Sequence, residues 1–530
     1  MGVIFMEKRL MILAISLILG YTCVMANLSA KMQNSQLLET AIHQSQLTMK
    51  VGQADGTIYD RNFVPLVNQD TAFYASVIPT FQSVAELMPH IEEMNPVLEG
   101  LQNGEPFVCR VDTDDFDCPE ITVLEIPQRQ NSSSLAQHII GYTRDHEGVT
   151  GLEADYNKIL RSLPDTATVT YTTDALGQIL MGEEPVISPI AYKNAGVVTT
   201  LDSRIQAICE NMDIPKGAIV VMDVESGDIL AMTSFPSYDS NHLADALDNP
   251  ESPFLNRCLS AYNVGSIFKL MTCATAYKLN MTNFLTNCTG KTKIKNQVFR
   301  CHDWRGHDIV DMKHAMIYSC NVFFVDLSQY LDPRIMLETA QSFGFGSQIA
   351  LTKSLISSSG SLPDIDDLSL PAEMANFCFG QGLLTATPLQ ITQMTCGIAN
   401  DGNMPLARLI KGYTLDNQTV ENEKNPIYAK SLPKNAAYYL QNLMIAAINE
   451  SDTSNAVPDT VFAGAKTSTA QTGRYDEEDI ELCHAWITGF FPIHQPKYAV
   501  TVFVEDGGYG NDAAAPIFKQ IADEITALPD

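Results

Sequence analysis

The stretch Tyr262-Asn-Val-Gly-Ser-Ile-Phe-Lys-Leu-Met-Thr272 decides how this chain folds around its chemistry. Within it, Gly265 interrupts the backbone pattern, and an apolar, helix-like periodicity begins at Ser266. A helix that starts there places Ser266 and Lys269 on one face, one turn apart. The first-turn N–H groups and the helix dipole then favour negative charge that develops at the serine. An amine within reach of a hydroxyl is a nucleophile–base pair, so the spacing predicts acyl-enzyme chemistry.

Two later segments distinguish this spacing from a chance occurrence. The same pattern recurs at Ser431-Leu-Pro-Lys434, where Pro433 disfavours a catalytic helix start. Downstream of Ser266, Ser319-Cys-Asn321 supplies a second hydroxyl and an amide. Lys466-Thr-Ser-Thr469 supplies a second amine with flanking hydroxyls in a strand-like run. The three groups follow one another in the order that serine acyl-transfer enzymes with a lysine base use.

The overall charge excludes one class of partner. The 530 residues include 33 Lys and Arg against 62 Asp and Glu, a net charge of −29. Binding to nucleic acid needs clustered cations that contact phosphates, so we expect no nucleic-acid partner. The length leaves room for two or three domains and a large core.

The N-terminal region contains a segment long enough to span a bilayer. An uncharged, mostly apolar run extends from Leu10 to Leu28, and two cations, Lys8 and Arg9, precede it. The positive flank belongs on the cytoplasmic side, so we expect residues 30–530 outside the cytoplasm. The alternative is a cleaved signal peptide, because Val24-Met-Ala26 fits a small-residue cleavage site. We predict an uncleaved, single-pass anchor, since the run has full spanning length.

From Gly217 onward the pattern predicts a sheet with helices segregated from it. Residues 218–233 alternate as two apolar strands about a Ser-Gly turn, which is typical of a hairpin. Helical periodicity follows over 266–279 and 321–330. Three strands and a closing helix are then expected at 461–471, 485–491, 498–505 and 516–528. Strands, a helical middle and further strands predict an α+β fold.

With these motifs, the chain resembles a class B penicillin-binding protein, a monofunctional peptidoglycan D,D-transpeptidase. The resemblance covers residues 200–530 strongly and 50–190 loosely. It implies the fold of serine β-lactamases and D,D-peptidases, in which helices and a helical subdomain surround an antiparallel five-stranded sheet. A membrane anchor and a β-rich mixed N-terminal domain precede it. The implied domains are an anchor at 1–29, a pedestal-like or dimerisation-like domain at 30–195, and a transpeptidase domain at 196–530.

The resemblance assigns catalytic roles to five motif residues. Ser266 attacks the penultimate D-Ala carbonyl of a stem peptide, and neutral Lys269 takes the proton. Ser319 relays that proton to the leaving D-Ala amine. Asn321 holds the stem peptide or Lys269, and Lys466 keeps Ser319 oriented.

The resemblance also implies a substrate-binding strand. Thr467 with Ser468 meets the terminal carboxylate, and the N–H groups of Ser266 and Thr469 form the oxyanion hole. The chain departs from the family pattern twice. Ser468 stands where the family usually has glycine, which is expected to narrow the site or to add a hydrogen bond, and Val264 stands where proline is usual.

A second constellation lies between the nucleophile and Asn321. Three thiols and one imidazole suit a closed tetrahedral zinc site, and the predicted ligands are Cys288, Cys301, His307 and Cys320. Some zinc-containing class B relatives of the elongation or sporulation type resemble this arrangement. We predict a structural zinc that fixes the Ser319 segment, whereas the acyl transfer itself needs no cofactor.

Other interpretations of the same cysteines and histidine remain open. A disulfide between Cys288 and Cys301 would close the hairpin expected over 291–300. Cys320 would otherwise be a small buried hydrophobe, and His302 could replace His307 as a ligand.

The implied function is cross-linking of peptidoglycan stem peptides, with β-lactams as covalent inhibitors. Three alternatives use the same motifs: a serine β-lactamase, a β-lactam sensor, and a largely scaffolding penicillin-binding protein. The expected partners are stem peptides, β-lactam antibiotics, the membrane and a polytopic glycosyltransferase.

Overall fold

The computed structural model describes residues 2–32, 45–129, 135–144, 147–162, 165–174, 176–190 and 195–529. These residues fall into two compact units that alternate along the chain. The first unit comprises residues 1–54, 71–127 and 164–192, and the second comprises 55–70, 128–163 and 193–530. The linear division into domains at 30–195 and 196–530 stays a prediction.

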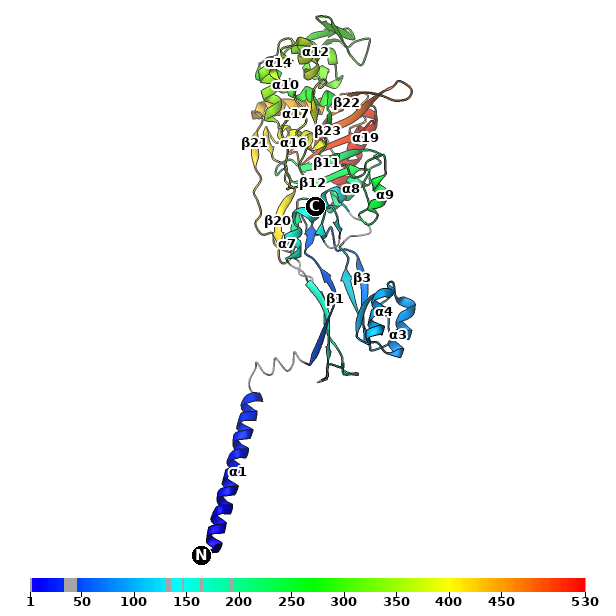
Figure 1. Cartoon of the computed structure of the whole chain (residues 1–530). Coiled ribbons are helices and arrows are strands. Elements are labelled where there is room, and N and C mark those ends of the chain that lie inside the picture. The colour runs from blue at the N-terminus through cyan, green and yellow to red at the C-terminus, as the bar shows by residue number, and fades with distance from the viewer. Residues whose placement is uncertain are drawn as a thin grey trace. The chain divides into compact units, whose positions relative to one another are not determined.

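The N-terminal helix α1 (Gly2–Met32) is the candidate membrane anchor (Figure 1). Its segment Arg9–Lys31 has a mean hydropathy of 2.0 and is entirely exposed. A helix of this length and composition is sufficient to cross a bilayer.

Two three-stranded sheets form most of the rest of the first unit. One has the order β1-β8-β9 and the other β4-β3-β5, and all their pairings are antiparallel. Their bounds are β1 (Gln46–Ala54), β3 (Thr71–Val77), β4 (Phe107–Val111), β5 (Ile121–Pro127), β8 (Asp165–Thr172) and β9 (Val186–Ser188). The helical elements of this unit are α3 (Phe81–Leu87), η1 (Met88–His90) and α4 (Met94–Asn103). This composition confirms the predicted β-rich mixed N-terminal region.

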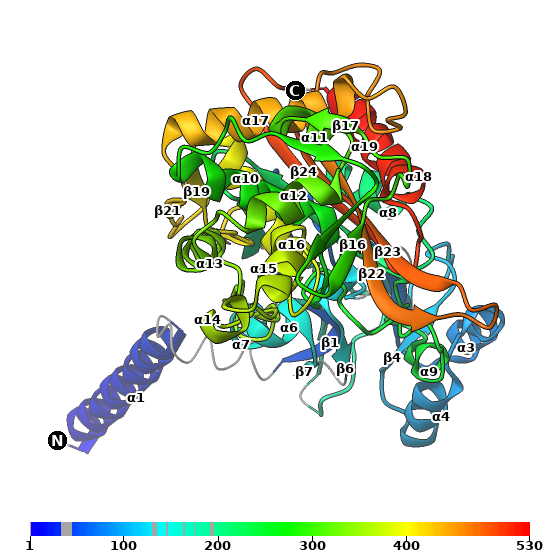
Figure 2. The same ribbon diagram turned by 90° about the horizontal axis from the view of Figure 1, so that it is seen from above.

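The second unit is built around a five-stranded antiparallel sheet with the order β12-β11-β24-β23-β22. Its strands are β11 (Gly217–Asp223), β12 (Ile229–Phe235), β22 (Gly464–Tyr475), β23 (Glu481–Phe491) and β24 (Tyr498–Val504). The predicted hairpin and the three predicted late strands therefore join one sheet. Figure 2 shows β22 and β23 as the paired strands at one side of it. The last strand in this order, β22, carries Lys466-Thr-Ser-Thr469.

Helices cover both faces of this sheet. On one face, Ile219 and Val221 of β11 pack in a core with Phe518 of α19. On the other face, Val220 and Met222 pack in a core that includes residues of α16 and α10. Successive side chains of a strand point to opposite faces, and both faces are buried here, so β11 carries no polar side chain from Gly217 to Met222. The bounds are α8 (Ser203–Glu210), α10 (Lys269–Lys278), α16 (Pro388–Ala399), α18 (Gly510–Ala513) and α19 (Ala515–Ala527).

A helical subdomain adjoins the second face (Figure 2). Its helices are α11 (Met312–Ile317), α12 (Asn321–Ser328), α13 (Pro333–Ser342), α14 (Ile365–Leu368), α15 (Pro371–Cys378) and α17 (Lys434–Asn449). Two small hairpin-like sheets accompany them, from β14 (Thr286–Cys288) with β17 (Asp308–Val310), and from β15 (Lys291–Ile294) with β16 (Gln297–Arg300). The hairpin expected over 291–300 is thus confirmed, as is the α+β fold with its helical subdomain.

Short elements complete the second unit. They are β2 (Thr57–Tyr59), α5 (Gln137–Ile140), β6 (Thr143–Arg144), β7 (Glu147–Gly148), α6 (Gly151–Asp155), α7 (Asn157–Arg161), β10 (Gly196–Thr199), α9 (Leu243–Leu247), β13 (Tyr262–Asn263), η2 (Gly265–Phe268), β18 (Thr385–Ala386), β19 (Asn403–Pro405), β20 (Ile410–Thr414) and β21 (Tyr428–Lys430).

Candidate active site

Ser266 lies on a tight turn that leads into α10. The sequence predicts an α-helix from Ser266, but residues 265–268 form the 3-10 turn η2 and the α-helix begins at Lys269. Such turns are frequent at helix N-termini. Gly265 has a φ of +64°, and its N–H donates to the Gly380 carbonyl at 3.0 Å. A Cβ on Gly380 would lie 1.9 Å from the Gly265 carbonyl oxygen, so this close approach requires glycine.

Four of the five predicted catalytic residues converge through hydrogen bonds. Lys269 Nζ lies 2.8 Å from Asn321 Oδ1, 3.1 Å from Ser319 Oγ and 2.8 Å from the Ser319 carbonyl oxygen. Lys466 Nζ approaches from β22, 3.3 Å from Ser319 Oγ and 3.0 Å from the Thr467 carbonyl oxygen. The Ser319 hydroxyl therefore contacts both amines. Ser266 lies one turn before Lys269, half-buried at the start of the same helical segment.

The environment of the two amines favours their neutral forms. Both side chains are buried, Lys269 completely and Lys466 to 2 % exposure. Burial and the nearby Lys466 cation lower the pKa of Lys269 to about 7. Burial lowers the pKa of Lys466 to about 8. Because a lysine is neutral above its pKa, Lys269 can accept a proton near neutral pH.

Ser319 is held in an unusual backbone conformation. Its φ is +47°, in the left-handed region that a non-glycine residue adopts at a cost of roughly 1 kcal/mol. The residue follows α11, and Cys320 then begins the connection to α12, with its N–H donating to the Ala315 carbonyl at 2.9 Å. This turn presents the Ser319 hydroxyl and carbonyl to Lys269.

The predicted substrate-binding strand has one unexpected feature. Thr467 and Thr469 are half-buried, but Ser468 is only 3 % exposed. The Ser468 hydroxyl donates to the Val264 carbonyl at 2.8 Å, so it faces the segment before Ser266. Ser468 was expected to contact a substrate carboxylate. In the structure its hydroxyl contacts the Val264 backbone instead.

The predicted metal ligands form a compact cluster. One donor atom from each of Cys288, Cys301, His307 and Cys320 lies within 4.8 Å of all the others. His307 Nδ1 lies 3.5 Å from the Cys288 sulfur and 3.6 Å from the Cys301 sulfur, and the sulfurs of Cys301 and Cys320 are 3.9 Å apart. The described residues include all twelve cysteines, and each is a free thiol.

The backbone segments at 288 and 306–307 pack closely against each other beside this cluster. The His307 N–H donates to the Cys288 carbonyl at 2.9 Å. Gly306 has a φ of +87°, and a Cβ there would lie 2.1 Å from the same carbonyl oxygen. On the other side, the Tyr318 ring stacks on His307 with centroids 5.1 Å apart and nearly parallel planes. His302 lies 3.9 Å from the Cys301 sulfur, outside the compact set.

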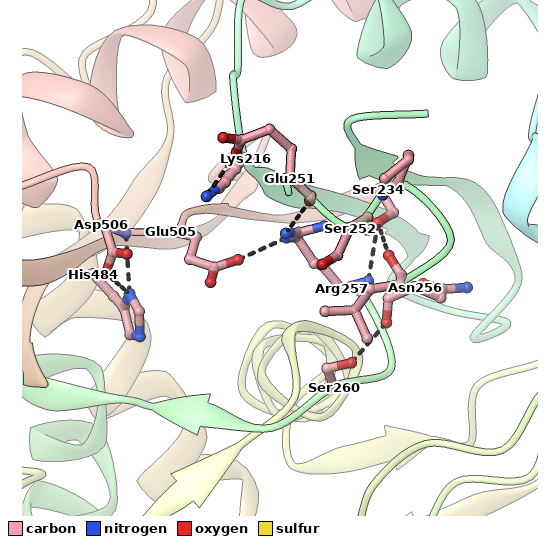
Figure 3. Close-up of polar contacts among 12 residues, drawn as sticks. Lys216, Ser234, Glu251, Ser252, Asn256, Arg257, Ser260, His484, Glu505 and Asp506 are labelled. Carbon is pink, nitrogen blue, oxygen red and sulfur yellow. Dashed lines mark hydrogen bonds and ion pairs between the residues drawn. The ribbon is translucent and has the colours of Figure 1, made fainter. Parts of the chain in front are cut away.

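Contacts that no sequence motif predicted anchor the chain before the nucleophile. Buried Arg257 donates from Nε to Glu505 Oε2 at 2.7 Å and from a terminal nitrogen to the Glu251 carbonyl at 2.9 Å (Figure 3). Glu505 directly follows β24, so this pair ties the loop before β13 to the central sheet. In addition, Trp486 Nε1 donates to the Asn263 carbonyl at 3.0 Å. The one available signal in the sequence was that Trp486 is one of only two tryptophans.

The site has the arrangement of serine acyl-transfer enzymes with a lysine base. One serine stands at the start of a helix with a lysine one turn later, and a second serine lies between two lysines. Residues 217–523 match the family model of the penicillin binding protein transpeptidase domain. This match spans more than half of the chain, and the chain therefore belongs to the penicillin-binding protein transpeptidase family as a class B member.

Relatives agree with this assignment, and solved structures share the fold. The peptidoglycan D,D-transpeptidase PbpA of Mycolicibacterium smegmatis is 31% identical over 362 residues, 61% of this chain and 71% of that protein. Stage V sporulation protein D of Bacillus subtilis is 28% identical over 73% of this chain and 62% of its own length. Penicillin-binding protein A from M. tuberculosis, solved as a ceftriaxone acyl-enzyme complex, has 23% identity over 76% of this chain and 93% of its own, with a TM-score of 0.63. A structure of a peptidoglycan synthase complex has 22% identity over 98% and 99% of the two chains and a TM-score of 0.71.

Proposed function

We propose that this protein is a serine D,D-transpeptidase that cross-links peptidoglycan stem peptides through an acyl-enzyme on Ser266. The observation that carries the assignment of residues is that Lys269 and Lys466 both contact the Ser319 hydroxyl, while Asn321 Oδ1 accepts from Lys269, beside the turn that bears Ser266. Curated relatives named D,D-transpeptidases support the same reaction.

Acylation follows from the protonation states of these groups. Neutral Lys269 takes the proton from Ser266 as its Oγ bonds to the carbonyl carbon of the penultimate D-Ala. The resulting oxyanion is stabilised by the N–H groups of Ser266 and Thr469, each typically worth about 3 kcal/mol. The C–N bond to the terminal D-Ala then breaks, and Ser319 passes the proton to the departing amine. Lys466 keeps Ser319 in place during this transfer.

Deacylation completes the cross-link. An amine of a neighbouring stem peptide attacks the ester carbonyl, a new amide forms, and Ser266 regains its proton. A β-lactam acylates Ser266 in the same way as the stem peptide. Its ring opens without releasing a leaving group, so the adduct stays on Ser266. Penicillin-binding protein A from M. tuberculosis has been solved as acyl-enzyme complexes with ceftriaxone, imipenem and penicillin G.

The reaction is tested with a synthetic stem-peptide donor that ends in D-Ala-D-Ala and an acceptor amine. We expect release of D-Ala together with a cross-linked product, and loss of both in Ser266→Ala. Rapid multiple-turnover hydrolysis of nitrocefin without cross-linking would instead identify a β-lactamase. Full rescue of a depletion strain by Ser266→Ala would identify a scaffold.

We also propose that Cys288, Cys301, His307 and Cys320 hold a structural zinc ion. Zinc–sulfur and zinc–nitrogen bonds of about 2.3 and 2.0 Å in a tetrahedron give ligand–ligand edges of about 3.5–3.8 Å. Three of the six ligand–ligand separations, 3.5, 3.6 and 3.9 Å, are close to these edges, and all six are within 4.8 Å. The sulfurs of Cys301 and Cys320 are also far beyond the bond length of about 2.05 Å that a disulfide needs. A zinc ion bound there would link the loops at 288 and 301–307 to the Ser319 turn.

The chain offers a matched pair of variants for the metal site. In Gly306→Ala, the new Cβ would collide with the Cys288 carbonyl oxygen, so we expect lower zinc content and slower acylation of Ser266. Gly473→Ala is the control, because Gly473 also has a positive φ but no atom within 4 Å of its Cβ position. Metal analysis and β-lactam acylation rates are measured on the same samples. Full zinc content in Gly306→Ala, or a metal-free wild-type protein with a Cys288–Cys301 disulfide, contradicts the site.

The protein is further proposed to be anchored by α1 with its catalytic domain outside the cytoplasm. The exposed apolar surface of α1 and its cationic flank support this orientation. A polytopic glycosyltransferase is the proposed partner. Related solved structures include a peptidoglycan synthase complex that coordinates polymerization and crosslinking, and a complex of penicillin-binding protein PBP2 with MreC from Helicobacter pylori. Co-purification of the full chain with a membrane glycosyltransferase tests the partner, and recovery of the chain without one contradicts it.

A further inference from the structure

The side chain of Ser468 is committed to the backbone that precedes the nucleophile. Its buried hydroxyl donates to the Val264 carbonyl at 2.8 Å, although the two residues are 204 positions apart. Val264 is also buried and lies two residues before Ser266. The hydroxyl therefore satisfies a buried carbonyl that is one residue from the turn on which Ser266 stands.

The hydroxyl also fits the space that Gly265 leaves. A Cβ on Gly265 would lie 2.4 Å from Ser468 Oγ, so the missing side chain of Gly265 makes room for this contact. The Gly265 N–H in turn donates a hydrogen bond to the Gly380 carbonyl. Gly265 is thus fixed between Gly380 and the Ser468 hydroxyl.

A neighbouring bond shows that this contact is part of a pair. Ser468 and Trp486 lie opposite each other in the β22–β23 ladder. Trp486 Nε1 donates to the Asn263 carbonyl, and Ser468 Oγ donates to the next carbonyl, that of Val264. One cross-strand pair therefore binds two successive carbonyls immediately before the nucleophile turn.

The strand behind this pair is itself held firmly. The Gly510 N–H donates to Thr469 Oγ1 at 3.1 Å, and a Cβ on Gly510 would lie 2.2 Å from the Ser468 carbonyl oxygen. The start of α18 thus packs directly against β22. A hydrogen bond from such a strand can set the position of the backbone that accepts it.

We propose that Ser468 is a positioning residue for acylation: its hydroxyl, together with the Trp486 indole, fixes the backbone before Ser266 relative to the strand that carries Lys466. The inference rests on the proposed function, because it assumes that Ser266 is the group acylated. Ser468 contacts neither the reacting atoms nor a substrate carboxylate in this account. Its effect is therefore on the rate of the chemical step and not on ligand binding.

The test measures the reaction of the protein with a fluorescent penicillin. It determines two constants separately: the dissociation constant of the noncovalent complex, and the first-order rate constant of the acylation that follows. Ser468→Ala removes the hydrogen bond that the hydroxyl donates to the buried Val264 carbonyl. We expect a roughly tenfold lower acylation constant, equivalent to about 1.4 kcal/mol, with the dissociation constant within about twofold of wild type. Ser468→Thr keeps the hydroxyl and is expected to retain an acylation constant within about threefold of wild type.

The chain supplies a matched control. Ser431 is also buried, and its hydroxyl donates to the Gly402 carbonyl at 3.1 Å, between the loop after α16 and the start of α17. Ser431→Ala removes the same kind of bond and is expected to leave acylation unchanged. If Ser468→Ala folds poorly, Trp486→Phe removes the partner bond to Asn263 and is expected to lower the same constant.

The outcomes distinguish this inference from the proposed function. Wild-type acylation at Ser266 with an unchanged acylation constant in Ser468→Ala overturns the positioning role alone. A change confined to the dissociation constant also overturns it, since Ser468 would then contact the ligand. Failure of the wild type to be acylated contradicts both proposals.

Discussion

Burial and a neighbouring cation both lower the pKa of the Lys269 amine. They lower the pKa of this amine to about 7, while burial lowers that of Lys466 to about 8. The neutral form of Lys269 therefore prevails above about pH 7, where Lys466 still retains much of its charge. One lysine is thus available as a base and the other as a cation that orients Ser319.

The first prediction concerns the pH dependence of acylation. Acylation by a β-lactam should fall about tenfold per pH unit below about 7, because protonated Lys269 cannot accept the Ser266 proton. Lys466→Gln removes the cation that lowers the pKa of Lys269, so the acidic limb should move to higher pH. Lys466→Arg keeps the charge and should leave the limb in place. Rate constants measured across the pH range check this, and an unmoved limb in Lys466→Gln contradicts the account.

The catalytic residues could be predicted from the sequence where they belong to short motifs. Ser266 with Lys269, and Ser319 with Asn321, stand at fixed spacings in the chain, and hydrogen bonds of Lys269 to Ser319 and Asn321 are found. The bond from Ser468 to Val264 was not predictable as such, because a side chain that reaches a carbonyl 204 positions away leaves no local pattern. The sequence raised only the alternatives of a narrower site or an added hydrogen bond at Ser468.

At the scale of elements, the Arg257–Glu505 pair connects the loop before β13 to the end of β24. Arg257 is 2 % exposed, so loss of its charge leaves the Glu505 carboxylate without its partner. We predict that Arg257→Met lowers the free energy of unfolding by roughly 3 kcal/mol. Arg305→Met removes the exposed Arg305–Asp303 pair and should leave the unfolding midpoint unchanged. Denaturant unfolding of both variants checks this, and equal stabilities would contradict it.

The elements of the central sheet were predictable because each has a strong local signal. The apolar run of β11 and the Ser-Gly turn before β12 specify a hairpin. The first turn of the nucleophile helix was not predictable in detail. Its 3-10 geometry accompanies the positive φ of Gly265 and the bond to Gly380, which lies far along the chain.

At the scale of the whole molecule, α1 is expected to determine where the enzyme works. Removal of residues 1–29 should release the protein into the soluble fraction while leaving β-lactam acylation within about twofold of the full chain, because Arg9–Lys31 is entirely exposed and is not part of the second unit, which carries Ser266. Fractionation and labelling of both forms check this. A shortened chain that still sediments with membranes would show that another surface binds the bilayer.

The central claim is that Ser266 is the nucleophile. Its most direct test is mass spectrometry of the protein after reaction with penicillin G, at the level of the intact chain and then of its peptides. The account predicts one adduct per chain, located on Ser266 and lost in Ser266→Ala. An adduct on Ser319 or any other residue, or an unmodified chain that remains correctly folded, would contradict it.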